Sequence, residues 1–211
     1  MFKKARILMI LSVLMCMGSI ANAAQPIDTP SSLLKLLPDD HSLGNRSAKI
    51  VMIEYSSTSC PHCASFHTNV FEKLNENYIK PGKLLYIYRD LPLNRPGLFG
   101  AIFAHCAGNL DYVHHIGMLM NSQPMWAYNN NYEKSLIDIG KLTGMTELEL
   151  KKCFSDEKLM NQILAKSMDA TKILNIVATP TFYIDGKKYS GKISYDEMSK
   201  LIDNLLVLSN K

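Results

Sequence analysis

The chain has 211 residues, which suits one domain, or one domain with an insertion, and allows a core that needs no disulfides. Hydrophobic residues make up 47% and charged residues 20%, a globular balance that excludes disordered, collagen-like and mucin-like chains. The formal net charge is +4, but Lys3, Lys4 and Arg6 account for most of it. The rest of the chain is nearly neutral, so we expect no nucleic-acid partner.

The first 23 residues have the three parts of a secretory signal peptide. A basic start is followed by an apolar run over residues 7–20 and by the small-x-small signal Ala21-Asn22-Ala23. The run is short for a membrane span, which needs about 20 residues, although an uncleaved anchor is the alternative. We expect cleavage after Ala23 and a soluble mature protein in the periplasm.

Residues 24–48 are polar and turn-rich and predict a mobile lead-in with one helical turn. Continuous apolar residues at 50–53 predict a buried strand. Apolar residues then recur at helical spacing from Cys63 to Tyr78, Pro81-Gly82 ends that helix, and Leu84 to Tyr88 predicts a second strand. This βαβ unit predicts parallel strands with a right-handed crossover.

The middle of the chain, from Gly97 to Asn175, has helical periodicity and no convincing strand. Thr146 and Glu149 form a capping box, and Ser155 is the expected cap of a long helix that follows. The helical block separates the βαβ unit from the elements that close the chain.

Strand patterns return at 181–184 and 187–190, on either side of the hairpin signal Asp185-Gly186. A capping box at Ser194 and Glu197 begins the last helix. The order βαβ, helical block, ββα predicts an α/β fold. Its sheet-based unit comprises residues 49–96 and 175–211, and residues 97–174 form an inserted helical subdomain.

The chemistry is expected at Cys60-Pro61-His62-Cys63, where a strand gives way to a helix. Free N–H groups and the helix dipole stabilise a thiolate at Cys60, and Cys63 lies one turn away, close enough for a disulfide. His62 adds a donor and partial positive charge, and Pro61 fits the first helical turn. A low thiol pKa favours the reduced form, so the disulfide would be a strong oxidant.

Other readings of this motif are weaker. A structural disulfide remains open, but zinc usually takes four ligands, and the remaining cysteines lie far along the chain. Haem attachment would need a histidine at position 64, which is alanine. A papain-like nucleophile would leave Cys63 without a role. We therefore predict a redox-active pair, with no metal and no cofactor.

Cys106 and Cys153 both lie in the helical block. They could be free buried thiols, which behave as small apolar residues. Because disulfides persist in an oxidising compartment, an exported protein would rarely leave two thiols free, so we predict a structural Cys106–Cys153 disulfide.

Thr179-Pro180 stands at the entry to a strand. An edge or turn proline is the simpler interpretation, because proline cannot donate to a sheet ladder. The alternative is a cis-proline that faces the active-site disulfide.

Taken together, the Cys-Pro-His-Cys motif, Thr179-Pro180, the Asp185-Gly186 hairpin and the helical insertion make residues 43–208 resemble the DsbA-type thiol:disulfide oxidoreductases of the thioredoxin superfamily. The resemblance implies a thioredoxin-like fold, a cis bond at Pro180 and a Thr179 backbone that binds the substrate strand. It also implies that Glu54 is a buried acid that transfers protons to and from Cys63. The alternative for Glu54 is a solvent-facing strand residue.

The sequence departs from this family at two places. Threonine before the cis-proline is more typical of isomerase-like relatives. The family's lysine partner of the buried acid has no match, because Leu85 occupies its place and Arg89 is not assigned the role. We expect His67, one turn beyond Cys63, only to pack.

The resemblance implies a monomeric periplasmic oxidase in which Cys60 is an exposed thiolate and Cys63 is more buried. Its substrates would be unfolded exported proteins with cysteines, and a quinone-linked membrane protein of the DsbB type would reoxidise it. The nearest alternative is a disulfide isomerase or reductase, although the short lead-in leaves no room for a dimerisation domain. A more remote alternative is a non-catalytic metal-binding or scaffold protein.

Overall fold

The computed structural model describes residues 30–108 and 112–209 of the protein. The expected signal peptide and its cleavage site after Ala23 lie outside these residues. Within the two described ranges, the helices are all too short or too polar to cross a membrane.

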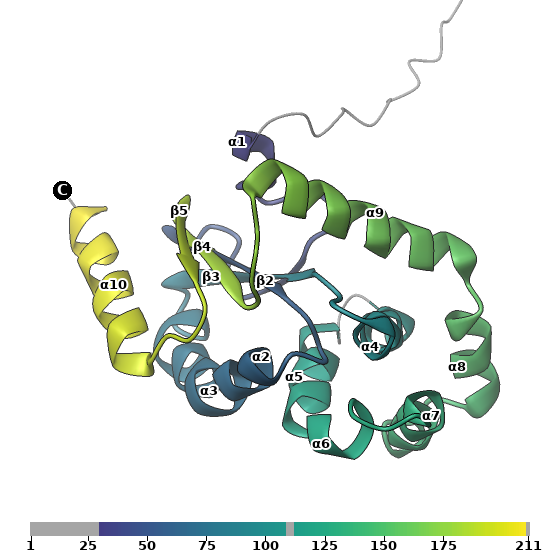
Figure 1. Ribbon diagram of the computed structural model, residues 1–211. Helices are drawn as coiled ribbons and strands as arrows, with labels where there is room; N and C mark the ends of the chain where they lie inside the picture. Colours follow the sequence, from purple (N-terminus) through teal and green to yellow (C-terminus); the bar gives the residue numbers. More distant parts are fainter. Residues whose placement is uncertain (1–29, 109–111, 210–211) are drawn as a thin grey trace, which may run out of the picture.

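A five-stranded mixed sheet lies at the centre of the molecule (Figure 1). Its strands are β1 His41–Leu43, β2 Ile50–Ser56, β3 Leu84–Asp90, β4 Thr181–Ile184 and β5 Lys187–Ser190. The spatial order is β1-β3-β2-β4-β5. β2 and β3 are parallel, as the βαβ pattern predicts, and the other neighbouring pairs are antiparallel. Asp185 and Gly186 join β4 to β5 with positive φ at both positions, as the hairpin signal predicts.

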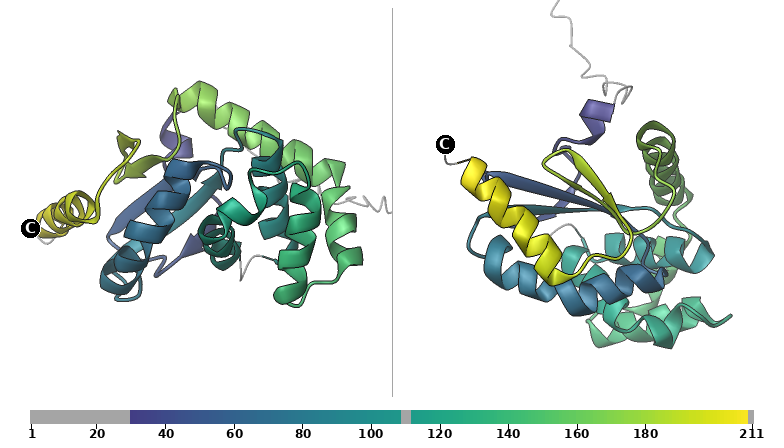
Figure 2. Two further views of the ribbon diagram at one scale, coloured as in Figure 1. Left: turned by 60° about the horizontal axis from the view of Figure 1, so that its bottom comes forward. Right: turned by 60° about the vertical axis from the view of Figure 1, so that its left-hand side comes forward.

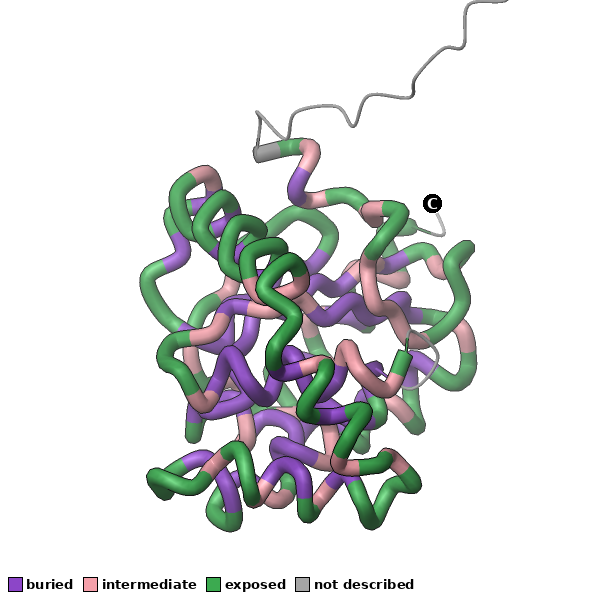
Figure 3. Tube along the Cα trace, turned by 90° about the vertical axis from the view of Figure 1, so that its right-hand side faces the viewer, coloured by how far each residue is buried: buried purple, intermediate pink, exposed green. Residues whose placement is uncertain are grey.

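Helices cover both faces of the sheet (Figure 2). They are α1 Pro30–Leu33, α2 Pro61–Phe66, α3 Glu72–Leu74, α4 Arg95–Cys106, α5 Tyr112–Asn121, α6 Gln123–Trp126, α7 Tyr132–Leu142, α8 Glu147–Phe154, α9 Glu157–Leu174 and α10 Tyr195–Leu208. The π-helical stretch η1 His67–Phe71 joins α2 to α3, and a second one, η2 Asn75–Ile79, continues α3, so that the four form one continuous helical segment. This segment, α5 and α10 pack on one face, and α1 with the end of α9 packs on the other. The central strands are therefore buried, whereas much of α9 is exposed (Figure 3).

The lead-in differs from the expectation, because it contributes strand β1 to the sheet. The guanidinium of Arg89, on β3, donates to both carboxylate oxygens of Asp40 at 2.8 Å each. It also donates to the Tyr55 hydroxyl at 2.7 Å and to the carbonyl of Leu33. A three-residue strand has too little pattern to be recognised locally. The position of β1 is fixed by this partly buried charge pair, which joins residues 49 positions apart.

The helical block from α4 to α9, called here the helical insertion, contains no strand among its described residues. It has its own apolar core, in which Phe103, Trp126, Leu136 and Leu150 are fully buried. The capping box at the start of α8 is present as predicted. The cap of α9 is Asp156 and not Ser155: the Asp156 carboxylate accepts from the Leu159 N–H at 3.0 Å, while Ser155 ends α8.

Candidate active site

The Cys60–Cys63 pair begins α2, directly after the loop that follows β2. Cys60 has extended backbone angles at the N-cap, and its carbonyl accepts from the Ala64 N–H at 3.0 Å. Pro61 occupies the first helical position, where no N–H is needed. Both cysteines are free thiols here. Cys63 is fully buried, and Cys60 is only 5% exposed, so the expectation of an openly exposed Cys60 is wrong.

The two thiols have opposite electrostatic environments. The Cys63 thiol donates to Cys60 and, with Thr179 and the backbone N–H groups of Cys63 and His62, lowers the pKa of Cys60 to about 5 against the effect of burial. His62 thus contributes through its backbone. Burial raises the pKa of Cys63, and its bond to Cys60 and the charge of Glu54 raise it further. At neutral pH the reduced pair holds a thiolate at Cys60 and a thiol at Cys63.

The peptide bond between Thr179 and Pro180 is cis, and it lies beside the redox pair. The Cys60 thiol lies 3.4 Å from the carbonyl oxygen of Thr179, 119 residues along the chain. The loop is brought there because β4, which follows it, pairs with β2, which leads to Cys60. Thr179 is buried, and its side chain, next to the Cys60 sulfur, contributes to the lowered pKa of that thiol.

A groove of about 370 Å³ opens beside this loop. Its lining combines His62 and Phe66 from α2 with Pro180 and with Ile193 and Tyr195 near the start of α10. His62 therefore faces a space next to the redox pair. The groove is large enough to hold side chains of a bound peptide.

Glu54 is fully buried on β2, which excludes the solvent-facing alternative. Its Oε2 accepts from the Tyr86 hydroxyl at 2.6 Å and lies 3.4 Å from the Nε2 of His67. Tyr86 faces Glu54 because side chains alternate along β3, which turns Leu85 to the opposite face. Arg89 is engaged with the lead-in and not with Glu54.

His67 packs against aromatic rings of the core, as the sequence predicts, and it also lies beside Glu54. It is 2% exposed, and its two ring nitrogens lack hydrogen-bond partners. The second carboxylate oxygen of Glu54 and the hydroxyls of Ser56 and Tyr88 are also buried without partners. A cluster of ionisable and hydroxyl groups thus lies behind Cys63. The spacing of four residues between Cys63 and His67 was the available signal, because it places both on one helical face.

Cys106 and Cys153 form a disulfide between the end of α4 and α8, with their Cα atoms 6.1 Å apart. The bond is half-buried and packs against the core of the helical insertion. Among the described residues, no group of three or more His, Cys, Asp or Glu side chains is arranged to hold a metal ion.

Comparisons with known proteins agree with this geometry. Residues 37–204 match the family described as Thioredoxin. A Rickettsia bellii protein, named as a candidate protein-disulfide oxidoreductase, is 34% identical over 173 residues, which are 82% of this chain and 66% of the relative. A similarly named Rickettsia prowazekii protein is 32% identical over 173 residues, 82% of this chain and 63% of its own. The chain thus spans slightly less than two thirds of the length of these relatives.

Among solved structures, α-DsbA1 from Wolbachia pipientis is 35% identical with a TM-score of 0.81, covering 86% of this chain and 98% of that one. BdbD from Bacillus subtilis, 21% identical with a TM-score of 0.70 over 80% and 93% of the two chains, shares the fold. The chain belongs to the DsbA-like thiol:disulfide oxidoreductases of the thioredoxin superfamily. The predicted thioredoxin-like fold with a helical insertion is confirmed.

Proposed function

We propose that the protein oxidises pairs of cysteines in exported proteins. The observation that carries this proposal is the opposite shift of the two thiol pKa values, lowered to about 5 at Cys60 and raised at Cys63. A stabilised thiolate favours the reduced enzyme, which makes its disulfide a ready electron acceptor. The groove beside Pro180 supplies a place for the substrate chain.

The reaction is a two-step exchange that moves two electrons from the substrate to the enzyme. A substrate thiolate attacks the Cys60 sulfur of the oxidised pair, so the Cys60–Cys63 bond breaks and Cys63 leaves as a thiolate. Cys63 then takes a proton, because its buried position disfavours the charge. A second substrate thiolate attacks the substrate sulfur of the mixed disulfide, and Cys60 leaves as a stable thiolate.

Glu54 is the group proposed to move the Cys63 proton, since its charge is felt at Cys63 and it is fully buried. Thr179 and Pro180 hold the substrate strand in the mixed disulfide, where the Thr179 backbone lies beside Cys60. The Cys106–Cys153 bond has a structural role in the helical insertion.

The catalytic cycle also needs a cellular compartment that holds the substrates and an oxidant that restores the disulfide. We infer that the basic, apolar leader exports the chain to the periplasm as a monomer. There it meets unfolded proteins with free cysteines. A quinone-linked membrane protein of the DsbB type returns the pair to the disulfide state.

A redox titration in glutathione buffers tests the proposal, with alkylation and mass spectrometry to read Cys60, Cys63, Cys106 and Cys153 separately. A reduction potential of the Cys60–Cys63 pair of about −120 mV supports the oxidase. A reduction potential of about −270 mV identifies a reductase. A value of about −180 mV identifies an isomerase, which is the role that a threonine at position 179 favours. A pair that does not cycle removes the enzyme proposal.

A further inference from the structure

The loop that presents Cys60 is fastened to the helical insertion. The Cys60 N–H closes a turn onto the Ser57 carbonyl at 3.0 Å. The Thr58 hydroxyl donates to the Gly97 carbonyl of α4 at 3.0 Å. Gly97 has no side chain to keep this loop away, since a Cβ there would lie 2.7 Å from the Ser57 hydroxyl. The insertion therefore sets where the loop lies.

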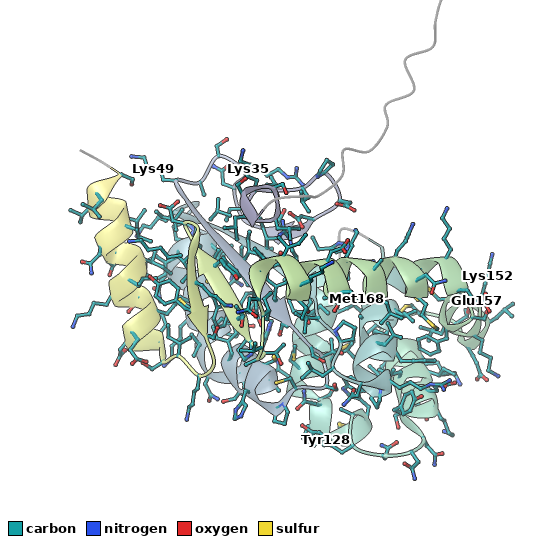
Figure 4. The ribbon with its side chains drawn as sticks, turned by 45° about the horizontal axis from the view of Figure 1, so that its top comes forward. Lys35, Lys49, Tyr128, Lys152, Glu157 and Met168 are labelled. Atoms are coloured by element: carbon teal, nitrogen blue, oxygen red, sulfur yellow. A yellow bond between two sulfur atoms is a disulfide. The ribbon has the colours of Figure 1, made fainter. Side chains whose placement is uncertain are left out.

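Gln123, the first residue of α6, holds the same loop from another side. It is 2% exposed, and its Nε2 donates to the carbonyls of Thr58 at 2.7 Å and Cys60 at 3.0 Å. Both carbonyls can only accept, so the amide nitrogen must face them and Oε1 must face away. Oε1 accepts from the hydroxyl of Tyr128. Tyr128 is 59% exposed and lies at the surface beyond α6 (Figure 4).

The Cys60 carbonyl is also the first acceptor of α2, since it takes the Ala64 N–H. Gln123 therefore binds the first turn of the helix whose N–H groups, at His62 and Cys63, stabilise the Cys60 thiolate. Fixing that carbonyl fixes the direction of those N–H groups relative to the Cys60 sulfur.

We propose that Gln123 is a positioning residue, which acts through the Thr58 and Cys60 carbonyls to hold the Cys60 sulfur over the start of α2. Tyr128 orients the amide of Gln123. The inference deepens the proposed function and rests on it. It gives the helical insertion a part in the reactivity of the redox pair, 63 residues away along the chain.

The test compares Gln123→Leu, Gln123→Glu and Tyr128→Phe with the unaltered protein. Thiolate absorbance of the reduced proteins against pH gives the pKa of Cys60. Gln123→Leu removes both donors and should raise that pKa by about one unit, a tenfold loss of thiolate at acidic pH. Gln123→Glu adds a negative charge and should raise it further. Tyr128→Phe should give a smaller rise.

Asn129→Ala is the matched control. Its amide bonds the Met125 carbonyl in the same region and does not touch the redox loop, so its Cys60 pKa should equal that of the unaltered protein. Folded Gln123 variants with an unchanged Cys60 pKa overturn the inference. Should those variants not fold, Tyr128→Phe decides, and an unchanged pKa there overturns it. The reduction potential of the Cys60–Cys63 pair in the unaltered protein tests the proposed oxidase function separately.

Discussion

At the scale of single residues, Cys60 makes the stability of the reduced protein depend on pH. Its pKa is about 5 in the folded protein against an ordinary value of 9.0, so the unfolded chain binds the proton that the folded chain lacks. This contribution is full above about pH 9, shrinks as the pH falls and is absent below about pH 5. Cys63 adds nothing between pH 5 and 8, because it is protonated in both states.

We expect the free energy of unfolding of the reduced protein, minus that of the oxidised protein, to rise from pH 5 to pH 8. Urea unfolding of both forms at several pH values measures this difference. The oxidised protein is the control, since it shares every titrating group except the two thiols, and Cys63 stays protonated in this pH range. A difference that stays flat with pH would contradict the low pKa of Cys60.

Glu54 gives a second prediction at this scale. Glu54→Gln preserves an acceptor for the Tyr86 hydroxyl but cannot exchange a proton with Cys63. We expect reduction of the oxidised enzyme by dithiothreitol to slow by about 10²-fold at pH 7, the usual size of general acid–base catalysis. Rapid-mixing kinetics measure it. Glu72→Gln, at an exposed position on α3, is the control and should react at the normal rate.

At the scale of elements, α4 carries the redox loop because two of its glycines allow close approach. A Cβ at Gly100 would lie 2.8 Å from the Trp126 ring and closer still to the Thr58 hydroxyl. Gly100→Ala should therefore destabilise the protein by about 1–3 kcal/mol, as overpacking does, despite the better helix propensity of alanine.

Gly117→Ala on α5 is the matched control for this prediction. A Cβ there meets nothing within 4 Å, so the same change should be neutral or stabilise the protein by up to about 1 kcal/mol. Thermal and urea unfolding of both variants compares them. Equal stabilities for the two would show that the α4 contact does not constrain the loop.

Elements specified by neighbouring residues could be predicted from the sequence, and those specified by distant contacts could not. The capping box of Ser194 and Glu197 lies within one turn, so the pattern alone indicates the start of α10. β1 has three residues and depends on the bond between Arg89 and Asp40, which no local pattern shows. The N-cap of α9 is Asp156 and not the predicted Ser155, because serine and aspartate are both suitable N-cap residues and only the direction of the backbone decides between them.

The active site divides in the same way. The Cys60–Cys63 spacing is local chemistry and was readable in the sequence. The register of β2 with β3 places the Tyr86 hydroxyl beside Glu54, and the sequence alone does not determine this register. Gln123 reaches the site from 63 residues away, so its role appears only once α6 is placed against the loop.

At the scale of the whole molecule, the Cys106–Cys153 bond closes 47 residues of the helical insertion. In the chain-entropy model a loop of this length stabilises the protein by about 4 kcal/mol. We expect the double variant Cys106→Ala, Cys153→Ala to lose about that much free energy of unfolding in urea. The unaltered protein, measured with the Cys60–Cys63 pair in the same redox state, is the reference. A loss below about 1 kcal/mol would contradict a structural role.

The short strand β1 has a consequence for solubility. Without it, β3 would be the edge of the sheet, and its apolar stretch from Leu84 to Tyr88 would present unpaired backbone groups to other chains. β1 pairs with Tyr86, Ile87 and Tyr88 and so covers this edge. The ion pair between Arg89 and Asp40 holds β1 in place. A chain shortened to begin after residue 48 would expose an amyloid-like template, and self-association would compete with folding.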